Sequence, residues 1–166
     1  MKKSLRAGAV LFSFVFFTTP TAGSLPMTPL DIAQAYYLAL YGKEFEQVRA
    51  VAAPDMVFED PTALAESGLA SQLDSLAAFL DYMAANLGED TTVRIVKSFA
   101  SNDRVVLYVE ITGTASAQYF GGPAHEAVEV KAEGLTVLQI HKGRVIRHTD
   151  YFDYPALNAF VAAQLR

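Results

Sequence analysis

The segment GRVIRHTDYFD, from Gly143 to Asp153, begins at a turn-forming glycine and alternates like a β-strand. This alternation predicts that His148 and Asp150 share one strand face with Ile146 and Phe152. A strand that buries its apolar face does not ordinarily carry an imidazole and a carboxylate there, because burying polar groups is costly unless they are paired. The two side chains are therefore either a pair that satisfies itself or the floor of a pocket.

Three more segments of period two precede this strand, over residues 91–101, 103–118 and 126–141. They are rich in β-branched residues and are divided by short turn-forming sequences. Consecutive long strands with short turns form an antiparallel meander, and long strands twist. The second half of the chain is therefore predicted to be a curved antiparallel sheet.

The first half of the chain has mainly helical periodicity and ends at Gly88. Its clearest helix carries one apolar stripe at alternating spacings of four and three residues. The pattern predicts helices over residues 28–42, 44–53 and 70–87, a short strand over 55–61, and a closing amphipathic helix over 155–165. This order predicts an α+β domain in which helices cover one face of a bent sheet.

The N-terminus has the three-part layout of a secretory signal peptide. Lys2, Lys3 and Arg6 precede an apolar run over residues 7–17, and short polar and small residues follow. The apolar run is too short to span a bilayer as a helix. We predict a signal peptide over residues 1–23, one mature domain over residues 24–166, and export to the periplasm or the medium.

Composition narrows the possible partners of the mature chain. Without Lys2, Lys3 and Arg6 it has 10 Lys and Arg (13 − 3) against 18 Asp and Glu, a net charge of −8. Such a surface repels phosphate groups, so nucleic acid and anionic membranes are not expected as partners. No later apolar run is long enough to span a membrane, so no membrane association is expected after cleavage.

The sequence offers no pattern for a bound metal or cofactor. It has three histidines, no cysteine and no His-x-x-x-His spacing. It also lacks a glycine-rich phosphate loop and a Gly-x-Ser-x-Gly nucleophile motif. We therefore predict no metal, no cofactor and no disulfide.

The element order, with VFEDP at residues 57–61 and GRVIRHTDYFD near the end, resembles the nuclear transport factor 2-like superfamily. Within it, the chain is similar to the SnoaL-like polyketide cyclase, limonene-epoxide hydrolase and ketosteroid isomerase branches over residues 28–165. The resemblance implies a cone-shaped curved sheet with helices packed on its concave face. It also implies a pocket for a small apolar molecule and a homodimer through the sheet.

The resemblance also implies roles for individual residues. Asp60 matches the general base of the steroid isomerases, and Tyr36, 24 positions earlier (60 − 36), matches their oxyanion-hole tyrosine. Asp150, in DYFD, matches the water-activating aspartate of the epoxide hydrolases, and Glu110 matches their proton-donating acid. Neither set is complete: for example, Tyr108 stands where those hydrolases have an arginine.

Each candidate residue also has a purely structural interpretation. An aspartate before a proline, such as Asp60, is typical of a turn. A tyrosine on a buried helix, such as Tyr36, is typically a packing residue. Glu110 in mid-strand is typical of a solvent or dimer face. His148 is either a proton donor near neutral pH or a partner of Asp150.

Three functions remain open from the sequence. The first is cofactor-free proton transfer on a small apolar molecule, of the isomerase or cyclase type. Asp60 or Asp150 would then be the base, and Tyr36 or His148 would polarise an oxygen. The second is a non-catalytic ligand-binding or dimerisation module. The third is an epoxide hydrolase.

Overall fold

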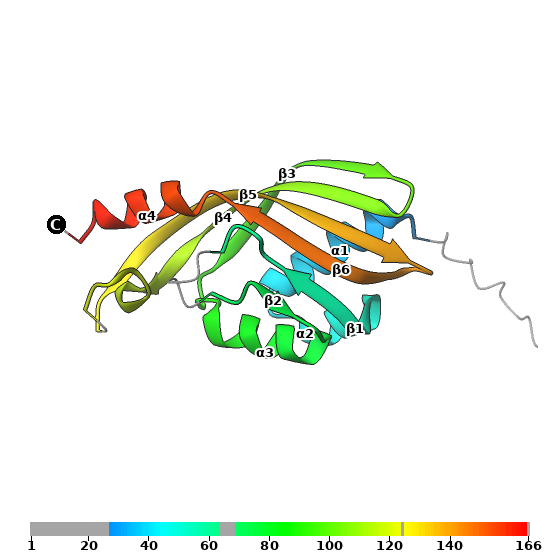
Figure 1. Cartoon of the computed structure of the whole chain (residues 1–166), viewed down its shortest axis with the longest axis horizontal. Helices are drawn as coiled ribbons and strands as arrows, with labels where there is room; N and C mark the ends of the chain where they lie inside the picture. Colours follow the sequence, from blue (N-terminus) through cyan, green and yellow to red (C-terminus); the bar gives the residue numbers. More distant parts are fainter. Residues whose placement is uncertain (1–26, 64–68, 124, 166) are drawn as a thin grey trace, which may run out of the picture.

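The computed structural model describes residues 27–63, 69–123 and 125–165 of the chain. The predicted signal peptide, residues 1–23, lies outside the described residues. In chain order, the elements are α1 (Pro29–Tyr41), α2 (Phe45–Val51), β1 (Ala52–Glu59), β2 (Gln72–Leu73), α3 (Leu76–Asn86), β3 (Thr92–Ser101), β4 (Arg104–Ser116), the 3₁₀ helix η2 (Ala117–Phe120), β5 (Ala127–His141), β6 (Arg144–Phe152) and α4 (Tyr154–Ala162) (Figure 1).

The predicted α+β fold with a curved sheet is confirmed, and the sheet is mixed (Figure 1). Its strand order is β2-β1-β6-β5-β4-β3, and β3 to β6 form the expected antiparallel meander. The expectation of a wholly antiparallel sheet is wrong for one pair, because β1 runs parallel to β6. A parallel neighbour requires a long crossover connection, and here α3 and the strands β2 to β5 lie between β1 and β6 in the chain.

Local capping sets where the helices begin. Thr28 and Asp31 form a capping box at the start of α1, with proline at the first helical position. Asp153 caps α4 through a hydrogen bond from the Ala156 N–H. α3 begins at Leu76, later than predicted, because the Ser75 side chain caps it and the preceding residues pair with β1 as β2. α2 ends at Val51, earlier than predicted, because the chain then enters β1.

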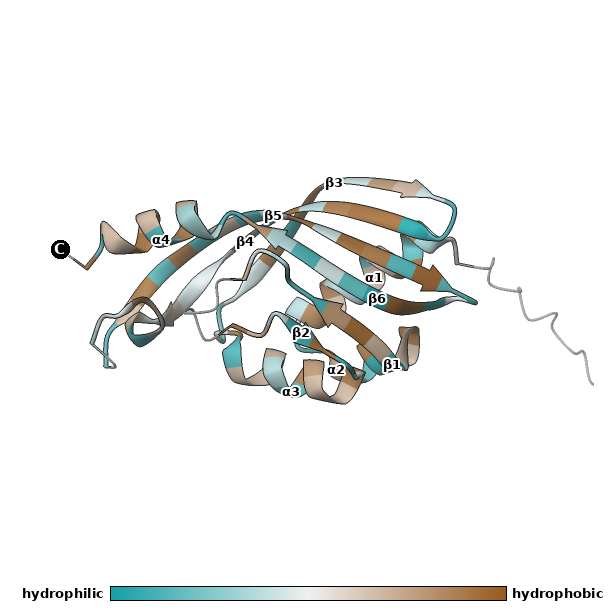
Figure 2. Ribbon diagram, viewed as in Figure 1, coloured by the Kyte–Doolittle hydropathy of each residue, from teal (hydrophilic) through white to brown (hydrophobic). Residues whose placement is uncertain are grey.

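The main core lies between the helices and the concave face of the sheet. Figure 1 shows α1, α2 and α3 together on one side of the sheet, and α4 at the far end near the C-terminus. Figure 2 shows the alternation of hydrophobic and hydrophilic residues along the meander strands. The inward residues of β4 (Val105, Leu107 and Val109) are fully buried in this core. A smaller cluster joins α4 to η2 and to the start of β5.

A β-bulge corrects the face predicted for part of β6. Gln139 pairs with Arg147, but the next residue, Ile140, pairs with Val145, so Ile146 is the extra residue. Val145 therefore takes the buried position expected for Ile146.

Among the described helices, none is long and apolar enough to cross a membrane.

Candidate functional site

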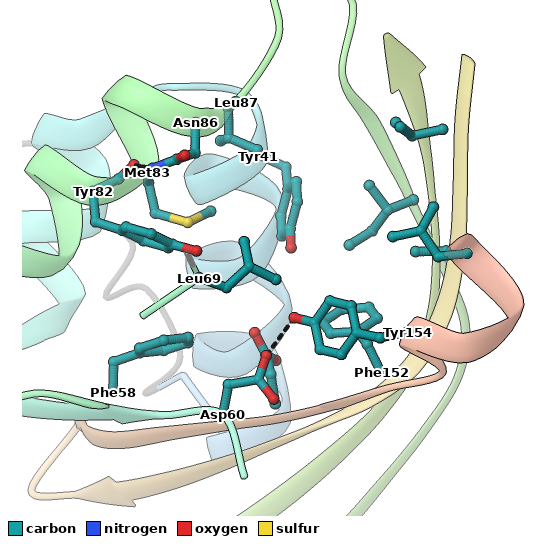
Figure 3. Close-up of a pocket in the computed structure, with 15 residues that line it drawn as sticks. Tyr41, Phe58, Asp60, Leu69, Tyr82, Met83, Asn86, Leu87, Phe152 and Tyr154 are labelled. Atoms are coloured by element: carbon teal, nitrogen blue, oxygen red, sulfur yellow. Dashed lines mark hydrogen bonds between the residues drawn. The ribbon is translucent and has the colours of Figure 1, made fainter. Parts of the chain in front are cut away.

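A cavity of about 200 Å³ opens between α3, the start of α4 and the concave face of the sheet (Figure 3). Its walls are mainly apolar and aromatic, with a few polar groups, which is the composition of small-molecule sites. The volume lies below the roughly 300–1,000 Å³ of pockets for drug-sized ligands, so it suits a smaller molecule. The lining residues are Tyr41, Phe58, Asp60, Leu69, Tyr82, Met83, Asn86, Leu87, Ile111, Val130, Ala132, Asp150, Phe152, Tyr154 and Leu157.

Asp150 presents one carboxylate oxygen to this cavity. Its Oδ1 accepts hydrogen bonds from the Thr136 hydroxyl at 2.5 Å and from the His148 Nε2 at 2.9 Å. Its Oδ2 accepts none from the described residues, although the residue is only 6% exposed and lines the cavity. Both bonds from the described residues fall on Oδ1, which leaves Oδ2 oriented to accept a hydrogen bond from a ligand.

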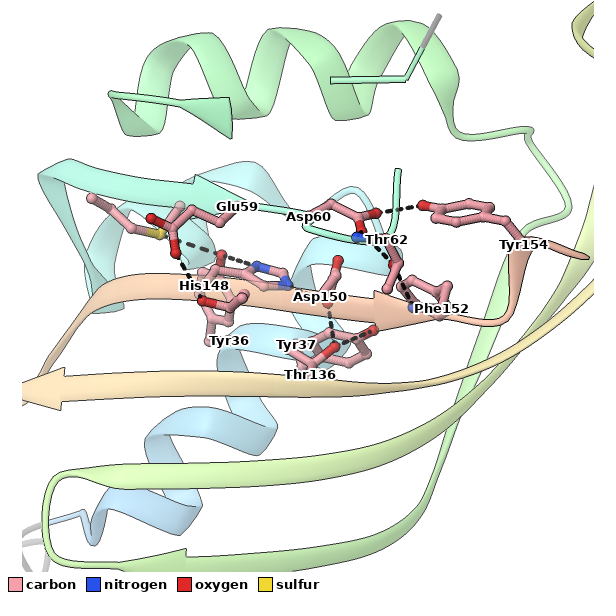
Figure 4. A network of polar contacts seen from close by, with 12 residues as sticks. Tyr36, Tyr37, Glu59, Asp60, Thr62, Thr136, His148, Asp150, Phe152 and Tyr154 are labelled. Atoms are coloured by element: carbon pink, nitrogen blue, oxygen red, sulfur yellow. Dashed lines mark hydrogen bonds and ion pairs between the residues drawn. The ribbon is translucent and has the colours of Figure 1, made fainter. Parts of the chain in front are cut away.

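His148 lies beneath the cavity and acts through Asp150. It is 1% exposed and is not among the lining residues. The Tyr36 hydroxyl lies 3.0 Å from its Nδ1 (Figure 4). Phe58 and Phe79 pack edge-on against the ring. With the Nε2–H donating to Asp150 and Nδ1 accepting from Tyr36, both ring nitrogens are satisfied. The pair predicted at residues 148 and 150 therefore exists, and its carboxylate also forms part of a pocket floor.

Tyr36 does not reach the cavity. It is fully buried, and its hydroxyl contacts the His148 Nδ1 and the Met56 sulfur, the latter at 3.4 Å. Burial, and then the charge of Asp150, raise the pKa of Tyr36 well above its usual range, so the hydroxyl keeps its proton. The oxyanion contact implied by the resemblance is not possible in this geometry, because the ring is enclosed by core residues.

Asp60 lines the cavity, but its oxygens are occupied. Oδ1 accepts hydrogen bonds from the Thr62 N–H and hydroxyl and from the Ala63 N–H, and Oδ2 accepts one from the Tyr154 hydroxyl at 2.5 Å. The Thr62 hydroxyl also accepts from the Phe152 N–H, which ties this turn to the end of β6. These contacts are those of the turn interpretation of Asp60.

Sequence reasoning missed the tyrosines of the cavity wall. Tyr154 opens α4 and turns back toward Asp60, and Tyr41 closes α1 beside the cavity (Figure 3). Burial raises the pKa of Tyr154, and the hydrogen bond to Asp60 adds to the effect. Burial also raises the pKa of Tyr41 well above its usual range. The proline after Tyr154 marks a helix start, but no local pattern tells which way its ring points.

Glu110 lies on the outer face of the sheet, away from the cavity. It forms an ion pair with Arg94 of the neighbouring strand β3. Tyr108, on the same face, donates its hydroxyl to Glu133 at 2.5 Å. The acidic pair implied by resemblance to the epoxide hydrolases is therefore not brought together, since Asp150 faces the opposite side. No group of three potential metal ligands occurs among the described residues.

Solved structures share this fold at low sequence identity. A protein from Shewanella putrefaciens described as a SnoaL-like polyketide cyclase is 21% identical, covers 82% of this chain and 97% of its own, and superposes with a TM-score of 0.71. An LEH-like epoxide hydrolase from M. tuberculosis is 16% identical over 81% of this chain and 90% of its own (TM-score 0.62). TerC, co-crystallised with polyporic acid, is 16% identical over 81% and 98% (TM-score 0.61). At such identities these likenesses establish the fold alone.

No protein of curated function matches the sequence significantly. A family model of the SnoaL-like domain matches residues 33–148, which is more than half of the chain. The chain therefore belongs to the SnoaL-like family.

Proposed function

We propose that the protein catalyses cofactor-free proton transfer, of the isomerase or cyclase type, on a small and mainly apolar molecule held in the cavity. Asp150 is the base. The observation that carries this proposal is the Asp150 carboxylate, whose Oδ1 is held by two protein donors while Oδ2 faces an apolar cavity without a partner among the described residues. A fixed, desolvated carboxylate suits a general base.

The proton comes from a carbon next to a carbonyl group. Asp150 Oδ2 takes this proton, and the electron pair of the broken C–H bond moves to the carbonyl oxygen as an enolate. Tyr41, which burial keeps protonated, is the cavity-wall hydroxyl that can donate to this oxygen by turning from its contact with Tyr37, whereas the Tyr154 hydroxyl already donates to Asp60. Where the enolate is conjugated with a C=C bond, return of the proton from Asp150 to the far carbon completes an isomerisation. Where the enolate carbon instead attacks a second carbonyl of the same molecule, a C–C bond forms, and Asp150 returns its proton to the resulting alkoxide oxygen.

The experiment is turnover of a library of ketones, lactones and epoxides by the full-length protein and by Asp150→Asn. Asparagine keeps an oxygen for His148 and Thr136 but cannot accept the proton, so we expect a loss of about 10²–10⁴-fold in kcat with little change in Tm. Glu110→Gln, which removes the same charge on the outer face, is the matched control and should keep full activity. Equal activity of Asp150→Asn and the wild type would refute the assignment of the base.

A non-catalytic binding module is the second candidate, favoured by the position of Tyr36. That tyrosine is enclosed in the core and so is absent from the cavity wall. This candidate predicts ligand binding without conversion. Clean conversion of any member of the library would exclude it.

The outer face of the sheet supports a proposed homodimer. Leu135 lies between Tyr108 and Tyr151 across the strands, and Phe99 near them is 63% exposed. A contiguous exposed apolar patch is typical of an interface. Sedimentation should give a dimer for the wild type and a monomer for Leu135→Asp. A monomeric wild type would refute this interface.

The basic and apolar pattern of residues 1–23 supports a proposed export to the periplasm or the medium. N-terminal sequencing of the protein from its native host should begin near Ser24. An N-terminus at Met1 in a cytoplasmic fraction would refute export.

A further inference from the structure

The cavity carries an uncompensated negative charge. Asp60 and Asp150 line it, and none of its described lining residues is a lysine, arginine or histidine. Glu59 of β1 pairs with Thr149 of the parallel strand β6. The next residues, Asp60 and Asp150, therefore lie at the same register position. His148 is the basic group in contact with either carboxylate, and it can neutralise at most one of them.

Among the described residues, only Asp150 of the two carboxylates has an oxygen with no hydrogen-bond partner. The oxygens of Asp60 accept four hydrogen bonds from the surrounding turn and from Tyr154. Asp150 Oδ2 has no partner among the described residues, and its residue is more than nine-tenths buried. A ligand that fits here must therefore donate to Asp150, because an acceptor would be repelled.

Aromatic rings form much of the remaining wall. Five of the lining residues are aromatic, and Figure 3 shows their rings around the space beside Asp60. The face of an aromatic ring attracts a positive charge, most strongly where water is excluded. The aromatic lining residues are Tyr41, Phe58, Tyr82, Phe152 and Tyr154.

We propose that the cavity selects a small hydrophobic molecule that bears a protonated amine. The ammonium group donates to Asp150 Oδ2 and lies against the aromatic rings, and the hydrophobic part fills the apolar walls. A cavity of about 200 Å³ suits a skeleton of about one ring. The net charge of −5 on the whole chain also favours the approach of a cation.

This assignment concerns the same cavity as the proposed function, but an amine that pairs with Asp150 Oδ2 occupies the base, so it is a ligand that blocks turnover and not the substrate. Binding needs no turnover, so the two proposals can fail separately. Amine-selective binding without conversion of any substrate would refute the proposed reaction and leave the amine site standing. Conversion of a neutral carbonyl compound, without selective binding of amines, would support the proposed reaction and refute the amine site.

The test compares three ligands that share one ring: benzylamine, benzyl alcohol and benzoate. Each is titrated into the full-length protein at neutral pH by calorimetry, where the amine is cationic and benzoate is anionic. We expect benzylamine to bind at least about tenfold more tightly than benzyl alcohol, and benzoate to bind weakest of all. Equal affinities for the amine and the alcohol, preferred binding of benzoate, or no binding of any of the three would overturn the proposal.

A pair of variants then locates the selectivity. Asp150→Asn replaces one carboxylate oxygen with an amide nitrogen and removes the negative charge. The side chain can then no longer form an ion pair with an ammonium group, so the preference for benzylamine should fall by about tenfold. Glu110→Gln changes the net charge equally, but on the outer face, and should keep the preference. Loss of the preference in both variants would assign it to net charge and refute the site. If Asp150→Asn does not fold, the ranking of the three ligands on the wild type decides alone.

Discussion

Replacement of Tyr36 by phenylalanine separates the role implied by the family from the role seen in the structure. If Tyr36 were an oxyanion donor, its hydroxyl would be needed for turnover and not for folding. In the structure, that hydroxyl is fully buried and contacts the His148 Nδ1 and the Met56 sulfur. We therefore expect Tyr36→Phe to weaken the fold and to leave the cavity wall unchanged.

The loss of stability expected for Tyr36→Phe follows from the His148 Nδ1, which loses its hydrogen-bond partner. His148 is 1% exposed, and its Nδ1 has no second hydrogen-bond partner among the described residues. An unsatisfied buried polar atom costs about 1–3 kcal/mol. Since 1 kcal/mol lowers Tm by about 2–4 °C in a chain of this size, the expected fall is about 2–12 °C.

Thermal unfolding followed by circular dichroism measures the change, and ligand affinity for the cavity is measured on the same samples. Tyr151→Phe is the matched control, because it removes a hydroxyl from an exposed tyrosine on the outer face. Its Tm should stay within about 2 °C of the wild type, as is usual for surface substitutions. An unchanged Tm for Tyr36→Phe, with a hundredfold loss of turnover, would refute the structural role and restore the oxyanion role.

Two further predictions concern the same region. Asp60→Ala removes the acceptor of four hydrogen bonds and should lower the free energy of unfolding by about 2–4 kcal/mol in urea titrations; an unchanged urea midpoint with lost turnover would show instead that Asp60 is a base. Burial raises the pKa of Tyr36, Tyr37, Tyr41 and Tyr154 above the unfolded value of 10.0, so the folded state holds these protons more tightly. The contribution of these tyrosines to the free energy of unfolding should therefore be fully present below about pH 10. Above that pH the free energy of unfolding should fall, by up to about 1.4 kcal/mol per pH unit for each tyrosine. Denaturant midpoints between pH 8 and 12 measure the slope, and a flat profile would contradict it.

The sequence predicted the fold class because the relevant signals are local. Period-two alternation gave the four meander strands, and helical periodicity gave the helices that precede them. Periodicity misplaced the start of α3, because Leu73 continues the apolar stripe while pairing in β2 rather than in a helix. The bulge at Ile146 was also invisible, since the cross-strand register with β5 decides which residue is extra.

Local sequence signals also predicted part of the candidate site. His148 and Asp150 were identified because two polar residues break an apolar strand face, and the structure buries both. Family resemblance placed Tyr36 and Glu110 in the same site, but Tyr36 is buried behind His148 and Glu110 faces outward. Spacing along the chain cannot distinguish a side chain that lines a cavity from one that lies beneath it.

The sequence by itself determined the alternation, the helix caps and the charge, because each depends on residues within a few positions of one another. The tertiary structure alone decided that, among the described residues, one oxygen of Asp150 has no hydrogen-bond partner while both oxygens of Asp60 have one. That difference arises chiefly from Thr136, which reaches Asp150 from the neighbouring strand β5, and from Tyr154, which reaches Asp60 from the last helix. Hydrogen bonds are satisfied in three dimensions, so the reactivity of a carboxylate depends on neighbours that are distant in the chain.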